Sequence, residues 1–247
     1  MRRTTKGRLI GVIAGSGVTE NFDIGRQKVV STPFGRVPVF VQPKGDYVVV
    51  PRHGVAHATP PHGINYRANV AALEQLGARE IIATSAVGSM NREFGVGQVG
   101  LADQFLDFTK ARQATFFEKE VIHTDMTHPY SERLNRQLIS SAEKSGLRVR
   151  PGLVYVCAEG PRFETPAEIR MYRALGGDVV GMTGVPEVVL ANEKGLEYAS
   201  VLIATNWAAG MQARVSQEEV FRVMKGLGNT VKRLIDTTVG ALRGERN

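Results

Sequence analysis

Residues 179–191 read VVGMTGVPEVVLA. Two β-branched residues lead into a glycine-rich turn, and an apolar run follows a proline. This pattern predicts a buried strand, a tight turn and a helix with Pro186 in its first turn. Ligands of α/β proteins bind where such a strand ends, and Thr183 offers a hydroxyl and a backbone N–H there, with Met182 as an apolar wall. An ordinary strand–helix junction is the alternative interpretation of this stretch alone.

Other predicted strands also end in residues that suit an anion. Glycine lets an oxygen approach the backbone closely, and hydroxyl, arginine and histidine side chains bind oxyanions. The segments concerned are Gly15-Ser16-Gly17, Arg52-His53-Gly54 and Ser85-Ala86. Together with Thr183 they could wrap one oxyanion. By itself, Gly15-Ser16-Gly17 favours a plain turn, because the third glycine and the helix of a dinucleotide-binding fingerprint are absent.

The remaining pattern alternates strands and helices. Strands are predicted as hairpins between residues 27 and 51, as a pair over 97–108, and singly over 9–14, 81–89, 154–158 and 198–204. Helices are predicted over 65–76, 131–145, from the cap at Thr165, and from the capping box at Ser216 to about 242. No repeat or linker divides the chain, so we expect one α/β domain over residues 1–247, with a central sheet flanked by helices.

The composition is that of a globular protein with a basic surface. Hydrophobic residues make up 43% of the 247 residues, which is enough for a core, and the formal net charge is +7. Lysine and arginine are scattered and aromatic residues reach only 7%, which argues against nucleic acid and favours a small anion such as phosphate. No apolar run suits a signal peptide or a membrane span, so we expect a cytoplasmic protein without a membrane partner.

Histidine and cysteine give little reason to expect a metal or a thiol nucleophile. His53, His57 and His62 lie in a Pro/Gly-rich loop without helical spacing and without a nearby cysteine, so we expect no metal site. The single cysteine, Cys157, lies in an apolar β-type run and is interpreted as a core residue. One cysteine also fits a reduced intracellular setting.

Several spaced motifs occur in the order found in one known family. From Ile10 to about the last helix, the chain resembles the trimeric purine nucleoside phosphorylase / methylthioadenosine phosphorylase family. The resemblance implies a three-layer fold around a mixed sheet, inorganic phosphate as co-substrate with no other cofactor, and a homo-oligomer (a trimer or a hexamer). The motifs that carry it are Gly15-Ser16-Gly17, Pro51-Arg52-His53-Gly54, Asn65-Tyr66-Arg67-Ala68-Asn69, Ala86-Val87-Gly88-Ser89, Glu159-Gly160-Pro161-Arg162-Phe163, Gly181-Met182-Thr183 and Pro186-Glu187.

The same resemblance implies roles for individual residues. The implied phosphate-binding residues are Ser16, Arg52, His53, Ser85, Ala86 and Thr183. The implied nucleoside-binding residues are Phe163 at the purine, Met182 at the ribose, Asn206, Ala208, Val220 and His123. Ser16, His53 and Asn206 are the candidate catalytic residues. His123 matches a loop position that reaches into the neighbouring subunit's site near the 5′ group of the nucleoside.

In the implied reaction, phosphate attacks the anomeric carbon while the purine departs through an oxocarbenium-like state. Asn206 is placed to bond the 7-nitrogen of the leaving purine. Family members that act on 6-aminopurines have aspartate at this position and two residues on, where this chain has Asn206 and Ala208. An amide both donates and accepts, which suits a 6-oxo group. We therefore expect inosine, guanosine or 5′-methylthioinosine as the substrate, with 5′-methylthioadenosine as the alternative.

Two other classes of function remain. A nucleosidase would use water in place of phosphate and would leave Arg52 and Ser16 without a role. A nucleotide or nucleic-acid binder is suggested only by the positive charge. His123 does not decide between a 5′-hydroxyl and a 5′-methylthio group, because imidazole can bond a hydroxyl or pack against sulfur.

Overall fold

The computed structural model describes residues 9–18, 25–43 and 46–244. Within these residues nine strands form one mixed sheet in the order β2-β3-β4-β1-β5-β8-β7-β6-β9. The strands are β1 (Leu9–Ala14), β2 (Arg26–Thr32), β3 (Gly35–Val41), β4 (Tyr47–Pro51), β5 (Ala78–Ser89), β6 (Val99–Phe108), β7 (Val149–Ala158), β8 (Val179–Gly181) and β9 (Glu197–Trp207).

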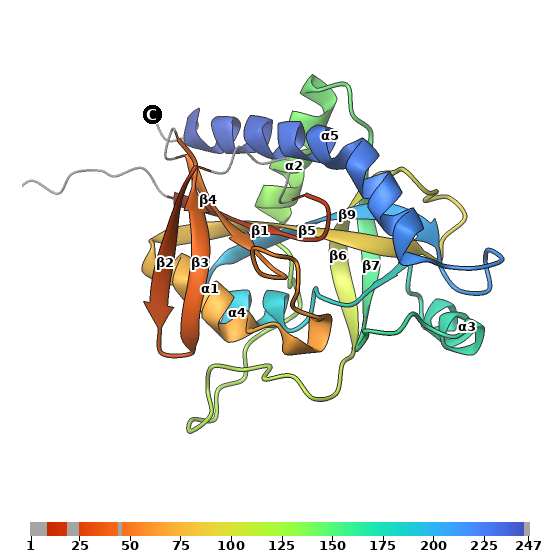
Figure 1. The fold of residues 1–247 in the computed structure, drawn as a ribbon, viewed down its shortest axis with the longest axis horizontal. Helices are drawn as coiled ribbons and strands as arrows, with labels where there is room; N and C mark the ends of the chain where they lie inside the picture. Colours follow the sequence, from red (N-terminus) through yellow and green to blue (C-terminus); the bar gives the residue numbers. More distant parts are fainter. Residues whose placement is uncertain (1–8, 19–24, 44–45, 245–247) are drawn as a thin grey trace, which may run out of the picture.

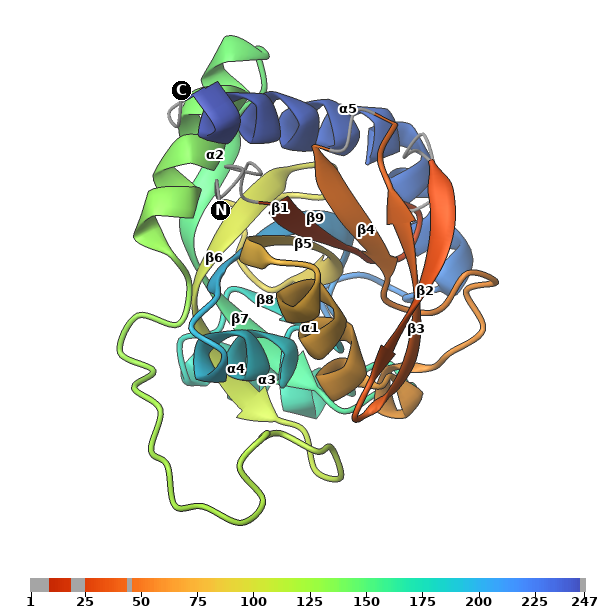
Figure 2. The ribbon, with the colours of Figure 1, turned by 90° about the vertical axis from the view of Figure 1, so that its left-hand side faces the viewer.

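Helices cover both faces of this sheet, which confirms the expected three-layer α/β fold (Figures 1 and 2). One face carries α2 (Glu132–Lys144) and α5 (Gln217–Gly244), which pack against each other. The other face carries α1 (Tyr66–Gln75) and α4 (Glu187–Glu193). A smaller cluster joins α3 (Pro166–Ala174) to β7 and β8, and η2 (Pro61–Gly63) is a single 3₁₀ turn.

The hydrophobic core has one part on each face of the sheet, and β1 contributes buried side chains to both parts. Ile10 and Val12 belong to the cluster under α2 and α5, whereas Ile13 belongs to the cluster under α1 and α4. Alternate side chains of a strand point to opposite faces of a sheet. A short run that is apolar throughout, such as LIGVIA, is therefore typical of a central parallel strand, and β1 pairs in parallel with both β4 and β5.

Five of the strands close into a ring. Strand β5 pairs with β9 and with β8, while β8, β7, β6 and β9 pair in succession. The ring closes at Gly88, which pairs with Val180 of β8 and with Asn206 of β9. This closure brings residues about 120 positions apart in the chain to one point, and no local sequence pattern predicted it.

Most of the expected elements are present, and two expectations were wrong. Residues 97–108 do not form a strand pair but the single strand β6, whose hydrogen-bonding partners are β7 and β9. Pro186 is the N-cap residue of α4 and not part of its first turn. The predicted hairpins are confirmed as the antiparallel pairs β2–β3 and β3–β4.

The predicted helix caps are largely confirmed. Ser131 accepts a hydrogen bond from the Leu134 N–H at the start of α2, and Thr165 forms a complete capping box with Glu168 at the start of α3. At α5, the Ser216 hydroxyl accepts from the Glu219 N–H, but the Glu219 carboxylate accepts from Gln212.

Among residues 9–18, 25–43 and 46–244, no helix has the length and apolar character needed to cross a membrane. Residues 1–8, on which the expectation about a signal peptide partly depends, lie outside the described residues.

Candidate active site

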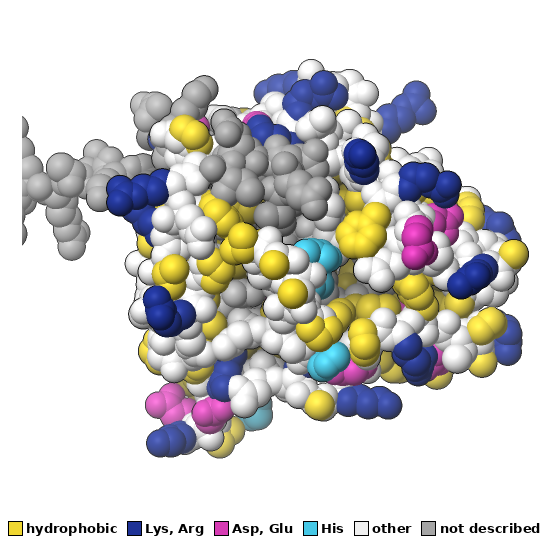
Figure 3. All heavy atoms as spheres, in the orientation of Figure 1, with side chains coloured by type: hydrophobic (Ala, Val, Ile, Leu, Met, Phe, Trp, Pro, Cys, Tyr) yellow, Lys and Arg dark blue, Asp and Glu magenta, His cyan; other side chains and the backbone are white. Residues whose placement is uncertain are grey.

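A cavity of about 360 Å³ opens beside the point where the ring closes. Small-molecule sites are typically concavities of about 300–1,000 Å³. Its walls come from segments far apart in the chain: the turn after β1, the loop after β4, the end of β5, the loop before α3, the turn after β8, the end of β9 and the start of α5. Figure 3 shows histidine side chains among hydrophobic ones near the middle of the face viewed in Figure 1.

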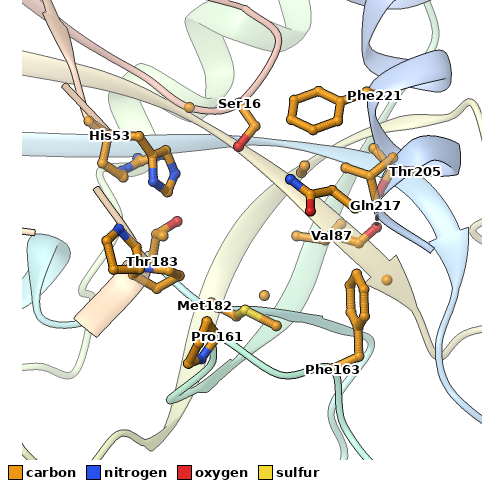
Figure 4. A pocket seen from close by; sticks show the side chains of 18 of the residues that line it. Ser16, His53, Val87, Pro161, Phe163, Met182, Thr183, Thr205, Gln217 and Phe221 are labelled. Carbon is orange, nitrogen blue, oxygen red and sulfur yellow. Dashed lines mark hydrogen bonds between the residues drawn. The ribbon is translucent and has the colours of Figure 1, made fainter. Parts of the chain in front are cut away.

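Most of the predicted site residues line this one cavity. The predicted residues in its wall are Ser16, Arg52, His53, Ala86, Phe163, Met182, Thr183, Asn206 and Val220. In Figure 4, Ser16, His53 and Thr183 lie toward one side of the cavity and Phe163 lies toward the other. We call the part bounded by Ser16, Arg52, His53 and Thr183 the anion end, and the part bounded by Phe163 and Asn206 the base end.

At the anion end, Arg52 is paired with a residue that the sequence reasoning gave no role. Its Nε and Nη2 donate to the two carboxylate oxygens of Glu187, each at 2.7 Å, and its Nη1 donates to the Thr84 carbonyl at 2.6 Å. Tyr198 donates its hydroxyl to the same carboxylate at 2.7 Å. Burial opposes the charge of Arg52, but the contact with Glu187 outweighs it and raises the pKa of Arg52. Two of the five guanidinium N–H donors remain for a ligand.

Two histidines whose rings are in tilted contact complete the wall beside Arg52. The His53 Nδ1 lies 2.9 Å from the Thr59 carbonyl, and the ring centroids of His53 and His57 are 4.6 Å apart. Burial lowers the pKa of His53 to about 4, and the positive charge of Arg52 acts in the same direction. His53 is therefore neutral at pH 7. His57 Nε2 lies 3.2 Å from the Ser16 hydroxyl oxygen.

The turn that carries Thr183 is held from behind by Tyr155 of β7. The Tyr155 hydroxyl accepts hydrogen bonds from the backbone N–H groups of Thr183 and Gly184, both at 3.2 Å. A Cβ at Gly184 would lie 2.8 Å from the Tyr155 ring, and a Cβ at Gly181 would also overlap Tyr155. The glycines of this turn are thus required by the close approach of an aromatic ring.

At the base end, the amide of Asn206 is buried and held in a fixed orientation. Its Oδ1 accepts from the Thr205 hydroxyl at 2.9 Å, and its Nδ2 donates to the Trp207 carbonyl at 2.9 Å. These two bonds leave one N–H and one lone pair for a ligand. Phe163 lines the same cavity and is 38% exposed. An exposed aromatic ring of this kind can stack against a flat ligand.

Three predicted residues do not line this cavity. Ser85 is buried next to Ala86, and its Oγ has no hydrogen-bond partner in the part of the chain that the structure describes. Ala208 is buried in the cluster beneath α3, where its N–H donates to the Ser89 carbonyl. His123 is exposed on the segment between β6 and α2, which extends away from the body of the molecule (Figure 2). Its contact with a neighbouring subunit stays a prediction.

The lining residues to which the sequence reasoning gave no role include His57, Glu164, Gln217 and Phe221. Gln217 directly follows the predicted cap Ser216, so the sequence predicted that it begins α5. The sequence did not predict that its side chain lines the cavity. Glu164 follows Phe163, and burial raises the pKa of its carboxyl. Within the described ranges, no group of three or more His, Cys, Asp or Glu residues could hold a metal ion.

Known proteins match both the sequence and the fold. Residues 9–240 match the Phosphorylase superfamily. The chain belongs to this superfamily. It is 44% identical to the probable S-methyl-5′-thioinosine phosphorylase of Methanothermobacter thermautotrophicus, over 97% of this chain and 86% of that protein. It is 45% identical to the 6-oxopurine nucleoside phosphorylase of Pyrococcus furiosus, over 96% of this chain and 94% of that protein.

Solved structures of this superfamily share the whole architecture. The methylthioadenosine phosphorylase of Schistosoma mansoni in complex with tubercidin aligns with a TM-score of 0.90 at 33% identity. The alignment covers 96% of this chain and 92% of that one. The family resemblance expected from the motifs is therefore confirmed.

Proposed function

We propose that this protein cleaves the N-glycosidic bond of 6-oxopurine nucleosides with inorganic phosphate. The products are the free purine and ribose 1-phosphate, or its 5-methylthio analogue when the substrate is 5′-methylthioinosine. The observation that carries the proposal is one cavity with an anion end at one side and the amide of Asn206 at the other. The names of the relatives from M. thermautotrophicus and P. furiosus, a probable S-methyl-5′-thioinosine phosphorylase and a 6-oxopurine nucleoside phosphorylase, support the same chemistry.

In this proposal phosphate is bound at the anion end and attacks C1′ of the ribose. Ser16 and Thr183 offer hydroxyl groups and Arg52 its two remaining N–H donors. The negative charge of the bound phosphate stabilises the oxocarbenium-like sugar as the bond to the purine breaks. Phosphate held within reach of C1′ also avoids the entropic cost of a bimolecular encounter. Ser85, whose buried Oγ lacks a partner among the described residues, is a further candidate donor.

The base end supports the choice of a 6-oxopurine. Such a base carries an N–H at N1 and an acceptor oxygen at C6, whereas a 6-aminopurine reverses both. Glu164 offers a carboxylate that accepts from N1–H, and Asn206 offers an N–H to the 7-nitrogen side. Mispairing at a buried polar site costs orders of magnitude in kcat/KM. The same amide stabilises negative charge on the departing base.

We further propose that the protein acts as a homo-oligomer. His123 lies on an exposed segment away from the cavity of its own chain, as expected if it serves the site of a neighbouring subunit. Val121 and Ile122 beside it are 88% and 47% exposed, and apolar exposure of this kind is typical of a subunit contact.

A substrate panel with and without phosphate tests the proposed function. The panel contains inosine, guanosine, 5′-methylthioinosine, adenosine and 5′-methylthioadenosine, and release of the free base is followed by chromatography. We expect turnover that requires phosphate and is at least about 100-fold more efficient on the oxo bases. Equal turnover in phosphate-free buffer would instead identify a nucleosidase. The best turnover on 5′-methylthioadenosine would instead identify a methylthioadenosine phosphorylase, as the S. mansoni protein is named.

A further inference from the structure

The one permanent cation at the anion end is already paired with a carboxylate. Among the described residues that line the cavity, Arg52 is the only lysine or arginine. Its guanidinium donates to both carboxylate oxygens of Glu187, each at 2.7 Å, and both side chains are 0% exposed. Because no water screens this pair, each charge is balanced mainly by the other. The neighbouring His53 adds no charge at pH 7, since burial lowers its pKa to about 4.

The carboxylate of Glu187 is itself held in place. Glu187 is the first residue of α4, and it is not among the described residues that line the cavity. Tyr198 of β9 donates its hydroxyl at 2.7 Å to Oε1, the same oxygen that the Arg52 Nη2 reaches. On the other side of the guanidinium, Nη1 donates to the Thr84 carbonyl of β5 at 2.6 Å. The pair is therefore held by contacts from α4, β9 and β5, and it lies behind the wall of the cavity.

A neutral pair attracts phosphate less strongly than an unpaired arginine would. The proposed reaction, however, also creates a positive charge, because the sugar passes through an oxocarbenium-like state beside the phosphate. An unpaired guanidinium would repel this cation and would offset the negative charge of the phosphate that stabilises it. When the charge of Arg52 is balanced from behind, its remaining N–H groups can still orient the phosphate.

We propose that Glu187 balances the charge of Arg52 so that the bound phosphate keeps the negative charge that stabilises the sugar cation. Glu187 acts through Arg52 and does not itself touch the phosphate, so it is a positioning residue. The pair weakens the binding of phosphate in the ground state and favours the transition state, which is the difference that raises kcat. This inference rests on the proposed function, because phosphate is the attacking anion.

Glu187→Gln in the full-length protein tests the inference. The amide has nearly the shape of the carboxylate but no charge, so Arg52 becomes an unpaired cation. We expect the dissociation constant of inorganic phosphate, measured by calorimetry, to fall at least about fivefold, and kcat on the best nucleoside to fall at least about tenfold. The KM for phosphate should fall as well. A merely structural role would have the opposite effect on this KM, because a misplaced Arg52 binds phosphate less well.

Two further variants separate charge from shape. Glu187→Asp keeps the negative charge at a shorter reach, so its phosphate affinity should not exceed that of the wild type, and its kcat should be higher than that of Glu187→Gln. Tyr198→Phe is the matched control, because it removes a hydrogen bond to the same carboxylate and leaves both charges in place. Its phosphate affinity and kcat should stay within about twofold of the wild type.

Thermal unfolding provides a second measurement. In Glu187→Gln the buried charge of Arg52 has no counter-charge until phosphate binds. We therefore expect this variant to have a lower Tm than the wild type without phosphate. Added phosphate should raise its Tm by more than it raises that of the wild type, because a ligand that binds more tightly stabilises the folded state more.

Several outcomes would overturn the inference. Unchanged or weaker phosphate binding by Glu187→Gln would show that Glu187 only holds Arg52 in place, and tighter binding with an unchanged kcat would show that the pair serves folding alone. A Glu187→Gln chain that does not fold even with saturating phosphate would also contradict it, since phosphate should replace the missing counter-charge. The proposed function survives each of these results, provided that the wild type requires phosphate for nucleoside cleavage. Cleavage by the wild type without phosphate would instead remove the proposed function.

Discussion

The orientation of Asn206 depends on two neighbours in the chain. Because the Trp207 carbonyl can only accept, the amide group next to it must be the donating Nδ2, and the Oδ1 therefore faces the Thr205 hydroxyl. The free N–H therefore has a defined direction, and Gly88 allows the approach, since a Cβ there would lie 3.1 Å from Nδ2. A single amide in a fixed orientation is thus able to select between two bases that differ in donor and acceptor pattern.

We expect Asn206→Asp to change the base preference. A carboxylate cannot donate to the Trp207 carbonyl or to the base, and it repels a 6-oxo group. Its kcat/KM on inosine should fall at least about 100-fold, while the ratio of adenosine to inosine turnover should rise. Steady-state kinetics on both nucleosides, with phosphate saturating, measures the change.

Thr205→Val is the matched control for this substitution. It removes the hydrogen bond to the Asn206 Oδ1 but keeps the amide, so turnover should fall less and the base ratio should not change. An unchanged ratio in Asn206→Asp itself would show that base selection does not depend on this residue.

At the level of the elements, the turn that carries Thr183 follows a very short strand. Strand β8 has only three residues, Val179–Gly181, too few to hold the following turn by its own ladder. Its partner β7 supplies the missing support through the Tyr155 hydroxyl, which satisfies two buried N–H groups. The position of Thr183 is therefore determined by a neighbouring strand.

Tyr155→Phe should uncouple this turn from β7. It leaves the N–H groups of Thr183 and Gly184 without an acceptor, which costs about 1–3 kcal/mol in the free energy of unfolding. The looser turn should also raise the KM for phosphate several-fold, with little effect on the nucleoside KM. Urea unfolding and steady-state kinetics measure the two effects.

Tyr172→Phe provides the control, because Tyr172 is also buried but contacts Phe108 of β6 through its ring. It should leave the KM for phosphate unchanged. If Tyr155→Phe behaves in the same way, the turn is held by packing alone and the hydrogen bonds are of little consequence.

At the scale of the whole molecule, the site depends on ring closure and, in our proposal, on a second chain. The ring of five strands places β5, β8 and β9 around Gly88, and the cavity forms there. The segment between β6 and α2 reaches outward (Figure 2), and His123 on this segment is exposed and does not line the cavity. In our proposal, His123 therefore acts only in the assembly of several chains.

Mixing two defective variants tests the shared site. Asn206→Ala lacks the base-binding amide and His123→Ala lacks the loop imidazole, so each alone should have reduced activity. When the two are unfolded together and refolded, a His123→Ala chain beside an Asn206→Ala chain has a complete site. About a quarter of the sites should then be intact after random 1:1 mixing. Activity is compared with that of the two variants refolded separately.

Refolding each variant with itself controls for losses in the procedure. Activity equal to the average of the two separately refolded variants would contradict a shared site. Size-exclusion chromatography with light scattering gives the number of subunits in the same samples.

The sequence by itself determined the elements and much of the site. Apolar runs of six residues such as 9–14, helix caps at Ser131 and Thr165, and glycines at strand ends follow local rules, because they depend on neighbouring residues only. The family resemblance likewise indicated Ser16, Arg52, His53, Thr183 and Asn206, which line one cavity in the structure.

Only the tertiary structure decided what these residues contact. The pairing of Arg52 with Glu187 spans 135 positions, and the closure of the ring joins β5 to β8 and β9 across more than 90. Such contacts depend on which strands become neighbours, and a strand's apolar pattern is the same for any partner. The sequence therefore did not reveal that the charge of Arg52 is neutralised, because Arg52 follows β4 whereas the carboxylate of Glu187 comes from α4.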